Sequence, residues 1–208
     1  MKKLKLFIGF ILFSFTLSCT NDEELNYEPQ TILDIIESNQ NYSTLADALQ
    51  KTGLTTTLDG SNSNDNHTLY APNNMAFDRF LSTAGFSSLD DVPVDVLEKV
   101  LLNHVMVDMI RYSAFETGYY KTAAQYINGN TMNNLSMHIE QVNMRVTLNG
   151  ESRITQGNVF ASNGIIHAID RVIPIPSIVT FAKADKNLEV LLSALTRSDL
   201  TTDFPFIL

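Results

Sequence analysis

The run of residues 157–174 constrains the fold more than any other part of this sequence. It reads as two short strands rich in β-branched residues, joined at Asn163-Gly164, a pair whose tolerance of positive φ suits a tight hairpin turn. The second strand carries His167 and Asp170 among aliphatic neighbours and ends at Pro174, which cannot donate to a continuing ladder. Two polar groups in an apolar strand need partners, so the segment is either a functional site or a fixed point of the fold.

Helical periodicity dominates the part of the chain that precedes residue 112. We predict helices over Thr31–Ser38 and Ser43–Lys51, with Thr31 as N-cap of the first and Gly53 as the stop signal of the second. A short strand from Thr68 to Ala71 follows.

Two more helices are expected after that strand. Pro72 ends the strand, and Asn73 or Asn74 can cap the first of these helices. The second is predicted over Val94–Val105, and its apolar face includes His104. We therefore expect His104 to point toward the core.

Alternation of apolar and polar residues replaces the helical period in the rest of the chain. Residues 124–127 form a candidate strand, and residues 144–148 and 151–155 flank Asn149-Gly150, a strong hairpin signal. Helices first and strands later predict an α+β domain, with helices grouped against a mostly antiparallel sheet or sandwich.

The N-terminus has the pattern of a secretion signal. Lys2, Lys3 and Lys5 precede the apolar run Leu6–Leu17, which is too short to span a bilayer but fits the core of a signal peptide. Cys19 follows, where it resembles the lipid-modified cysteine of a bacterial lipoprotein; ordinary signal cleavage nearby is the alternative. We predict a signal peptide over residues 1–18 and a membrane anchor at Cys19.

An acidic stretch follows that cysteine. Residues 19–28 are polar and acidic and suit a tether between lipid and domain. Asp22-Glu23-Glu24 resembles the surface-export signal of some Gram-negative lipoproteins, although a solvated linker would look the same. The expected location is the outer membrane or cell surface of a Gram-negative bacterium.

Charge and cysteine content exclude several classes of function. The 208 residues carry a net charge of −9, and removal of the leader would make the chain more acidic, so binding to phosphate backbones is not expected. Cys19 is the only cysteine, which excludes an internal disulfide, and the sequence predicts neither a metal site nor a cofactor.

An internal repeat begins near the C-terminus. Residues 31–58 align with residues 177–204 at a constant offset of 146, with identities that include Leu45/Leu191 and Ala48/Ala194. About 32 residues cannot bury a core of their own. The tail over residues 177–208 therefore either starts a second, truncated repeat in a fragment of a tandem protein, or packs on the first domain. The fragment is the favoured interpretation.

Two sequence boxes resemble those of the fasciclin domain family. The first covers residues 68–77, with a strand, Ala-Pro and a helix that starts near Ala-Phe; the second covers residues 163–174, with Asn-Gly, His, Ile-Asp and a final Pro. Asn103-His104 lies where the family carries a Tyr-His pair. The matching residues are Thr68, Ala71, Pro72, Ala76, Phe77, His104, Asn163, Gly164, His167, Ile169, Asp170 and Pro174.

The resemblance covers residues 29–176, with departures at Tyr70, Asn73 and Asn103. It implies a compact α+β fold, with a β-sandwich-like core flanked by helices. It also implies a secreted or surface-anchored module associated with cell adhesion and with matrix or polysaccharide contact.

His104, His167 and Asp170 are the best candidates for chemistry, because a histidine oriented by a carboxylate can act as a general base. The sequence shows no serine elbow, H-E-x-x-H motif or phosphate loop beside them. Histidines on apolar faces usually pin neighbouring segments, and we expect His167 and Asp170 to lock the sheet to the helices. The leading hypothesis is a non-catalytic adhesion module that contacts a cell-surface protein or polysaccharide. The alternative is a hydrolase, or an accessory subunit of an envelope polysaccharide-processing system, that uses His167 and Asp170.

Overall fold

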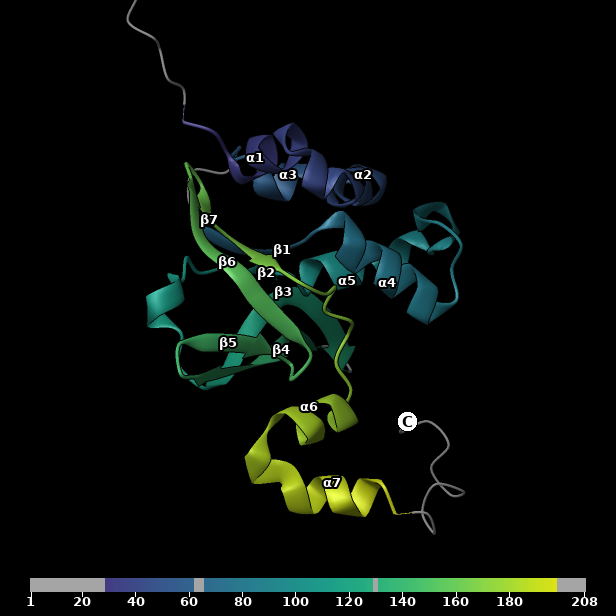
Figure 1. Cartoon of the computed structure of the whole chain (residues 1–208). Coiled ribbons are helices and arrows are strands. Elements are labelled where there is room, and N and C mark those ends of the chain that lie inside the picture. The colour runs from purple at the N-terminus through teal and green to yellow at the C-terminus, as the bar shows by residue number, and fades with distance from the viewer. Residues whose placement is uncertain (1–28, 62–65, 129–130, 198–208) are drawn as a thin grey trace, which may run out of the picture.

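The computed structural model describes residues 29–61, 66–128 and 131–197 (Figure 1). The predicted signal peptide, Cys19, the acidic tether and the last residues of the tail lie outside the described residues. The first part of the described chain is helical. Its helices are α1 (Ile32–Ser38), the 3₁₀ turn η1 (Gln40–Tyr42), α2 (Ser43–Thr52), α3 (Thr55–Leu58), α4 (Asn74–Ala84), η2 (Leu89–Asp91) and α5 (Val94–Leu102).

Seven strands form one sheet, and most of them come later in the chain. They are β1 (His67–Pro72), β2 (Val105–Met106), β3 (Gly118–Asn128), β4 (Thr131–Val142), β5 (Arg145–Leu148), β6 (Ser152–Ala161) and β7 (Gly164–Ile169). The short helix η3 (Tyr112–Ala114) lies between β2 and β3.

The strand order in the sheet is β2-β1-β7-β6-β5-β4-β3. All neighbouring pairs are antiparallel except β1 and β7, which run parallel with His67 opposite Gly164 and Pro72 opposite Ile169. The two edge strands, β2 and β3, contact each other, so the sheet curls into a near-barrel. The α+β class predicted from the sequence is confirmed, with helices flanking the sheet.

The apolar residues form two cores, one on each side of β1 and β7. The first lies between the helices and these strands and is built around Ile36, Leu49 and Phe77, all at most 1% exposed. The second fills the inside of the near-barrel and includes Tyr70 and Ile139, both fully buried. Because β1 and β7 are buried on both faces, their sequences do not alternate between apolar and polar residues, and their polar residues His67, Thr68 and His167 are buried as well.

The helix termini follow the local sequence signals. Thr31 caps α1, its hydroxyl accepting a hydrogen bond from the backbone N–H of Asp34, and α2 ends at Gly53 in the left-handed conformation. Asn73 caps α4. The helix predicted over Val94–Val105 ends instead at Leu102, because the chain turns there to enter β2.

The hairpin between β6 and β7 turns one residue earlier than predicted. Its turn residues are Ser162 and Asn163, Ala161 pairs with Gly164, and Gly164 begins β7. A side chain on Gly164 would collide with the backbone carbonyl oxygen of His67 in β1. The glycine is therefore required for the close approach of two parallel strands, and not for the turn.

The described part of the tail, residues 177–197, contacts the sheet through α6 and the turn after it. It contains α6 (Ile178–Ala184), the 3₁₀ turn η4 (Lys186–Leu188) and α7 (Glu189–Leu195), each starting 146 positions after its counterpart in α1, η1 and α2. Tyr119 of β3 stacks edge-on against Phe181, and its hydroxyl donates a hydrogen bond of 2.8 Å to Asp185. Contact between α6 and the sheet is compatible with both interpretations of the tail, and a second repeat over residues 177–208 stays a prediction.

Candidate functional site

His104 lies at the end of α5 and is fully buried. Its Nδ1 donates to the carbonyl oxygen of Val100 at 2.7 Å, and its Nε2 accepts the backbone N–H of Ile173 at 2.9 Å. Burial lowers the pKa of His104 from 6.5 to about 4, although the bond to Val100 opposes this shift. The neutral ring therefore joins the last turn of α5 to residues 170–176, the closing segment that follows β7.

Asn103 is a second buried tie to that closing segment. Its side-chain amide donates to the carbonyl oxygen of Pro174 at 3.1 Å, and its Oδ1 accepts the hydroxyl of Thr122 in β3 at 3.3 Å. Where the family carries an aromatic residue, this chain places a fully buried amide that bridges two parts of the domain. Adjacent residues, Asn103 and His104, thus fix the backbone at Ile173 and Pro174.

His167 is fully buried in β7 and bonds only to backbone. Its Nδ1 accepts the N–H of Asn158 in β6 at 3.2 Å, and its Nε2 donates to the carbonyl oxygen of Ile110 at 2.9 Å. Burial lowers the pKa of His167 below its ordinary value. The ring lacks a free lone pair for proton abstraction, because a backbone N–H occupies the only unprotonated nitrogen.

Asp170 does not pair with His167. Its carboxylate accepts the backbone N–H of Arg153 in β6 at 2.7 Å, and its own N–H donates to the carbonyl oxygen of Arg153. The expectation that these two residues lock the sheet to the helices is wrong in its partners. Both side chains bond to the backbone of β6, and His167 also bonds to Ile110 in the loop after β2. Because side chains along a strand alternate between its two faces, residues three positions apart point in opposite directions.

The helices are tied to the sheet by Asn163. Its Oδ1 accepts the N–H of Ile32 in α1 at 2.8 Å, and its amide donates to the carbonyl oxygen of Leu58 in α3 at 2.9 Å. Thr68 in β1 holds the loop after β2 instead: its hydroxyl donates to the carbonyl oxygen of Asp108 and accepts the N–H of Ile110. The remaining box residues are apolar; Ala71, Pro72, Ala76, Phe77 and Ile169 are buried, and Pro174 is exposed.

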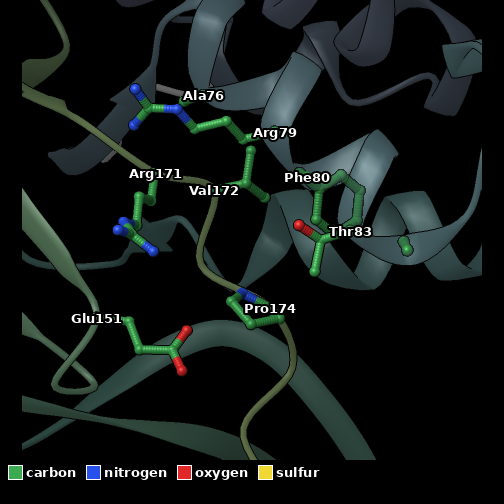
Figure 2. A pocket seen from close by; sticks show the side chains of 9 residues that line it. Ala76, Arg79, Phe80, Thr83, Glu151, Arg171, Val172 and Pro174 are labelled. Atoms are coloured by element: carbon green, nitrogen blue, oxygen red, sulfur yellow. The ribbon is translucent and has the colours of Figure 1, made fainter.

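A pocket of about 260 Å³ opens beside the closing segment (Figure 2). Helix α4 contributes Arg79 and Phe80, and the turn between β5 and β6 contributes Glu151. Arg171 and Pro174, which follow β7, complete the wall. In Figure 2 the two guanidinium groups lie at the left, the ring of Phe80 lies at the right with Val172 between them, and Pro174 and Glu151 lie below.

No motif in the sequence points to these pocket residues. Arg79 lies on the exposed side of α4, and Arg171 stands next to Asp170 in a family box, so neither carries a motif of its own. Only the packing of α4 beside the end of β7 brings their charges together. Two arginines this far apart in sequence could not be paired without the tertiary structure.

The described part of the chain holds neither a metal-binding cluster nor a membrane-spanning helix. No group of three or more His, Cys, Asp or Glu side chains is arranged there to hold a metal ion. Within the same residues, every helix is too short or too polar to cross a membrane.

Comparison with curated proteins finds relatives in animals and bacteria. Transforming growth factor-beta-induced protein ig-h3 of Sus scrofa is 27% identical over 152 residues, which cover 73% of this chain and 20% of that protein. Protein sll1483 of Synechocystis is 27% identical over 143 residues, which cover 69% of this chain and 72% of that protein. The chain therefore spans about a fifth of the animal relative and most of the bacterial one.

The fold also matches a solved structure. A FAS1 domain pair from the insect cell adhesion molecule Fasciclin I aligns with a TM-score of 0.52 and 16% sequence identity, over 73% of this chain and 52% of that one. The family model of the fasciclin domain matches residues 40–176, which contain both sequence boxes, the buried histidines and the pocket. This chain belongs to the fasciclin domain family.

Proposed function

We propose that this protein is a non-catalytic adhesion module, held at the outer membrane or cell surface of a Gram-negative bacterium by a lipid on Cys19. It would contact a cell-surface protein or polysaccharide and require no cofactor. Fasciclin domains are in general adhesion-related, non-catalytic modules. The solved neighbour comes from a cell adhesion molecule, which supports the same role here.

One observation carries the non-catalytic part of the proposal. Both candidate histidines spend both ring nitrogens on backbone hydrogen bonds, and the carboxylate of Asp170 faces the N–H of Arg153. A hydrolase that used His167 and Asp170 would need the two side chains in contact and open to substrate. The geometry therefore supports a scaffold that presents a binding surface.

Adhesion is tested with the full chain immobilised on beads and exposed to bacterial cells, host matrix and a glycan array. Binding to at least one of these surfaces is expected, above that of beads carrying a heat-denatured sample of the same chain. Absence of binding to every surface would contradict the proposal.

The anchor is tested separately in cells. Radiolabelled palmitate should be incorporated into the wild-type chain and not into Cys19→Ala. Protease added to intact cells should then degrade the anchored chain if the acidic run after Cys19 directs surface export. Equal labelling of both chains would contradict the lipid anchor, and full protection of the wild-type chain would contradict surface exposure.

A further inference from the structure

We infer that the pocket between α4 and the end of β7 binds a carboxylate-bearing sugar, a uronic acid unit of an acidic polysaccharide. This inference rests on the proposed adhesive function and names the ligand class and the site. Four properties of the pocket support it: two arginines without protein partners, an apolar wall, a carboxylate in the same pocket and a rigid floor.

The two arginines lack protein partners. Within the described residues, neither Arg79 nor Arg171 forms an ion pair or a hydrogen bond through its guanidinium. The chain has 23 acidic and 14 basic residues, so acidic partners are abundant on its surface. Two like charges that face one pocket repel each other, and a bound carboxylate would relieve that repulsion with planar, bidentate hydrogen bonds.

Part of the pocket wall is apolar, and the pocket volume suits one sugar ring. Phe80, Val172 and Pro174 supply the apolar part of the lining, and Val172 is 6% exposed. A volume of about 260 Å³ is slightly below the usual range for small-molecule sites, so one monosaccharide unit fits better than a larger group. The C–H face of a pyranose can pack on the ring of Phe80 while its carboxylate reaches the arginines.

Glu151 distinguishes a uronate from other anions. Its carboxylate is free of ion pairs within the described residues and lines the same pocket as the arginines. A carboxylate accepts hydrogen bonds from hydroxyl groups, which a sugar supplies, and it repels the second charge of a phosphate. A ligand with one negative charge at one end and hydroxyls at the other matches this arrangement.

The buried histidine makes the floor of the pocket rigid. His104 binds the N–H of Ile173, and Asn103 binds the carbonyl oxygen of Pro174, so the backbone between Arg171 and Pro174 is held from the core side. A preorganised wall loses little conformational entropy when a ligand binds. His104 and Asn103 thus connect α5 to the closing segment and also position one wall of the pocket.

The test is a calorimetric titration of the full chain with a short oligoglucuronate. Arg79→Gln and Arg171→Gln should each weaken binding about tenfold, the loss expected for one charge-assisted contact. Arg145→Gln is the matched control, since it removes the same charge from an exposed arginine of β5 that does not line this pocket. The affinity of Arg145→Gln for the oligoglucuronate should equal that of the wild-type chain.

Three further probes separate the ligand classes: the neutral glucose oligomer, a sulfated oligosaccharide and an acidic peptide. Each should bind at least tenfold more weakly than the uronate. Equal or tighter binding of any of them, uronate binding that survives both arginine substitutions, or no uronate binding at all would overturn the inference. If beads carrying Arg79→Gln/Arg171→Gln still adhere to cells as the wild type does, the adhesive function stands and only this site is wrong.

Discussion

The imidazole of His104 accepts the backbone N–H of Ile173 at 2.9 Å, across 69 positions of sequence. The same ring donates to Val100, so one buried side chain joins α5 to the segment that ends the domain. A neutral histidine can do this because it carries one donor and one acceptor at opposite sides of a rigid ring. The match of His104 to the histidine of the family's Tyr-His pair therefore has a structural cause.

Removal of this ring should be costly. We expect His104→Ala to lower the free energy of unfolding by about 2–4 kcal/mol, since it leaves an unsatisfied N–H and carbonyl and opens a cavity. Urea denaturation measures the change. Val96→Ala, an exposed position on the same helix, should stay within about 0.5 kcal/mol of wild type. If His104→Ala lowers the free energy of unfolding no more than Val96→Ala does, the ring does not stabilise the fold.

The same residue predicts an acid-sensitive domain. Its pKa is 6.5 in the unfolded chain and about 4 in the folded one, so the unfolded state binds the proton first as the pH falls. The stability that His104 contributes is complete above pH 6.5 and decreases toward pH 4, by on the order of 3 kcal/mol. Chemical denaturation at a series of pH values measures the slope, and His104→Gln should flatten it. An equal slope in both proteins would contradict the assignment.

His167 should also stabilise the fold through its two hydrogen bonds to the backbone. His167→Ala is expected to lower the free energy of unfolding by about 1–3 kcal/mol, because it leaves the N–H of Asn158 and the carbonyl of Ile110 without partners. Asp170→Asn keeps an acceptor for Arg153 and should cost less than about 1 kcal/mol. Thermal melting compares the two variants. An unchanged melting temperature for His167→Ala would exclude the structural role.

Gly164 should tolerate no side chain. Gly164→Ala places a Cβ against the backbone of β1, and the strands would have to separate to admit it, at a cost of about 3 kcal/mol. The control is Gly118→Ala, where an added Cβ meets no atom within 4 Å. Circular dichroism during urea denaturation should show a lower midpoint for the first variant only. Equal midpoints would contradict the close approach of β1 and β7.

Local signals in the sequence predicted the helices of this fold well. Thr31, Gly53 and Asn73 are caps whose effect is confined to one turn, and each is confirmed. The hairpin at Asn149-Gly150 is confirmed too, with both residues at positive φ, although its turn has three residues, 149–151, because Leu148 pairs with Ser152. Local chemistry was sufficient wherever the structure is determined by neighbours in sequence.

Longer-range features were predicted less well. β4 was not predicted, because Thr131–Val142 is largely polar on the face that it exposes and becomes a strand by pairing with β3 and β5. The parallel pairing of β1 with β7 was not predicted either, since it joins segments about 100 residues apart. The arginine pocket falls in the same class: no periodicity relates Arg79 to Arg171.

Docking of the tail provides a further prediction. Tyr119→Ala removes the ring contact with Phe181 and the hydrogen bond to Asp185, so α6 should separate from the sheet. Hydrogen exchange should show loss of protection over residues 178–184, with β4 and β5 unchanged. Tyr126→Ala, an exposed tyrosine on the same strand, is the matched control. Unchanged protection of α6 in Tyr119→Ala would show that other contacts hold the tail.

The central claim is that this domain binds a cell-surface protein or polysaccharide and does not hydrolyse it. The most direct measurement incubates the immobilised full chain with cells, matrix and acidic polysaccharide, and records both the fraction retained and the reducing ends released. We predict retention on at least one of these surfaces without release of reducing ends. Release that is lost in a folded His167 variant, or no retention on any surface, would contradict the account.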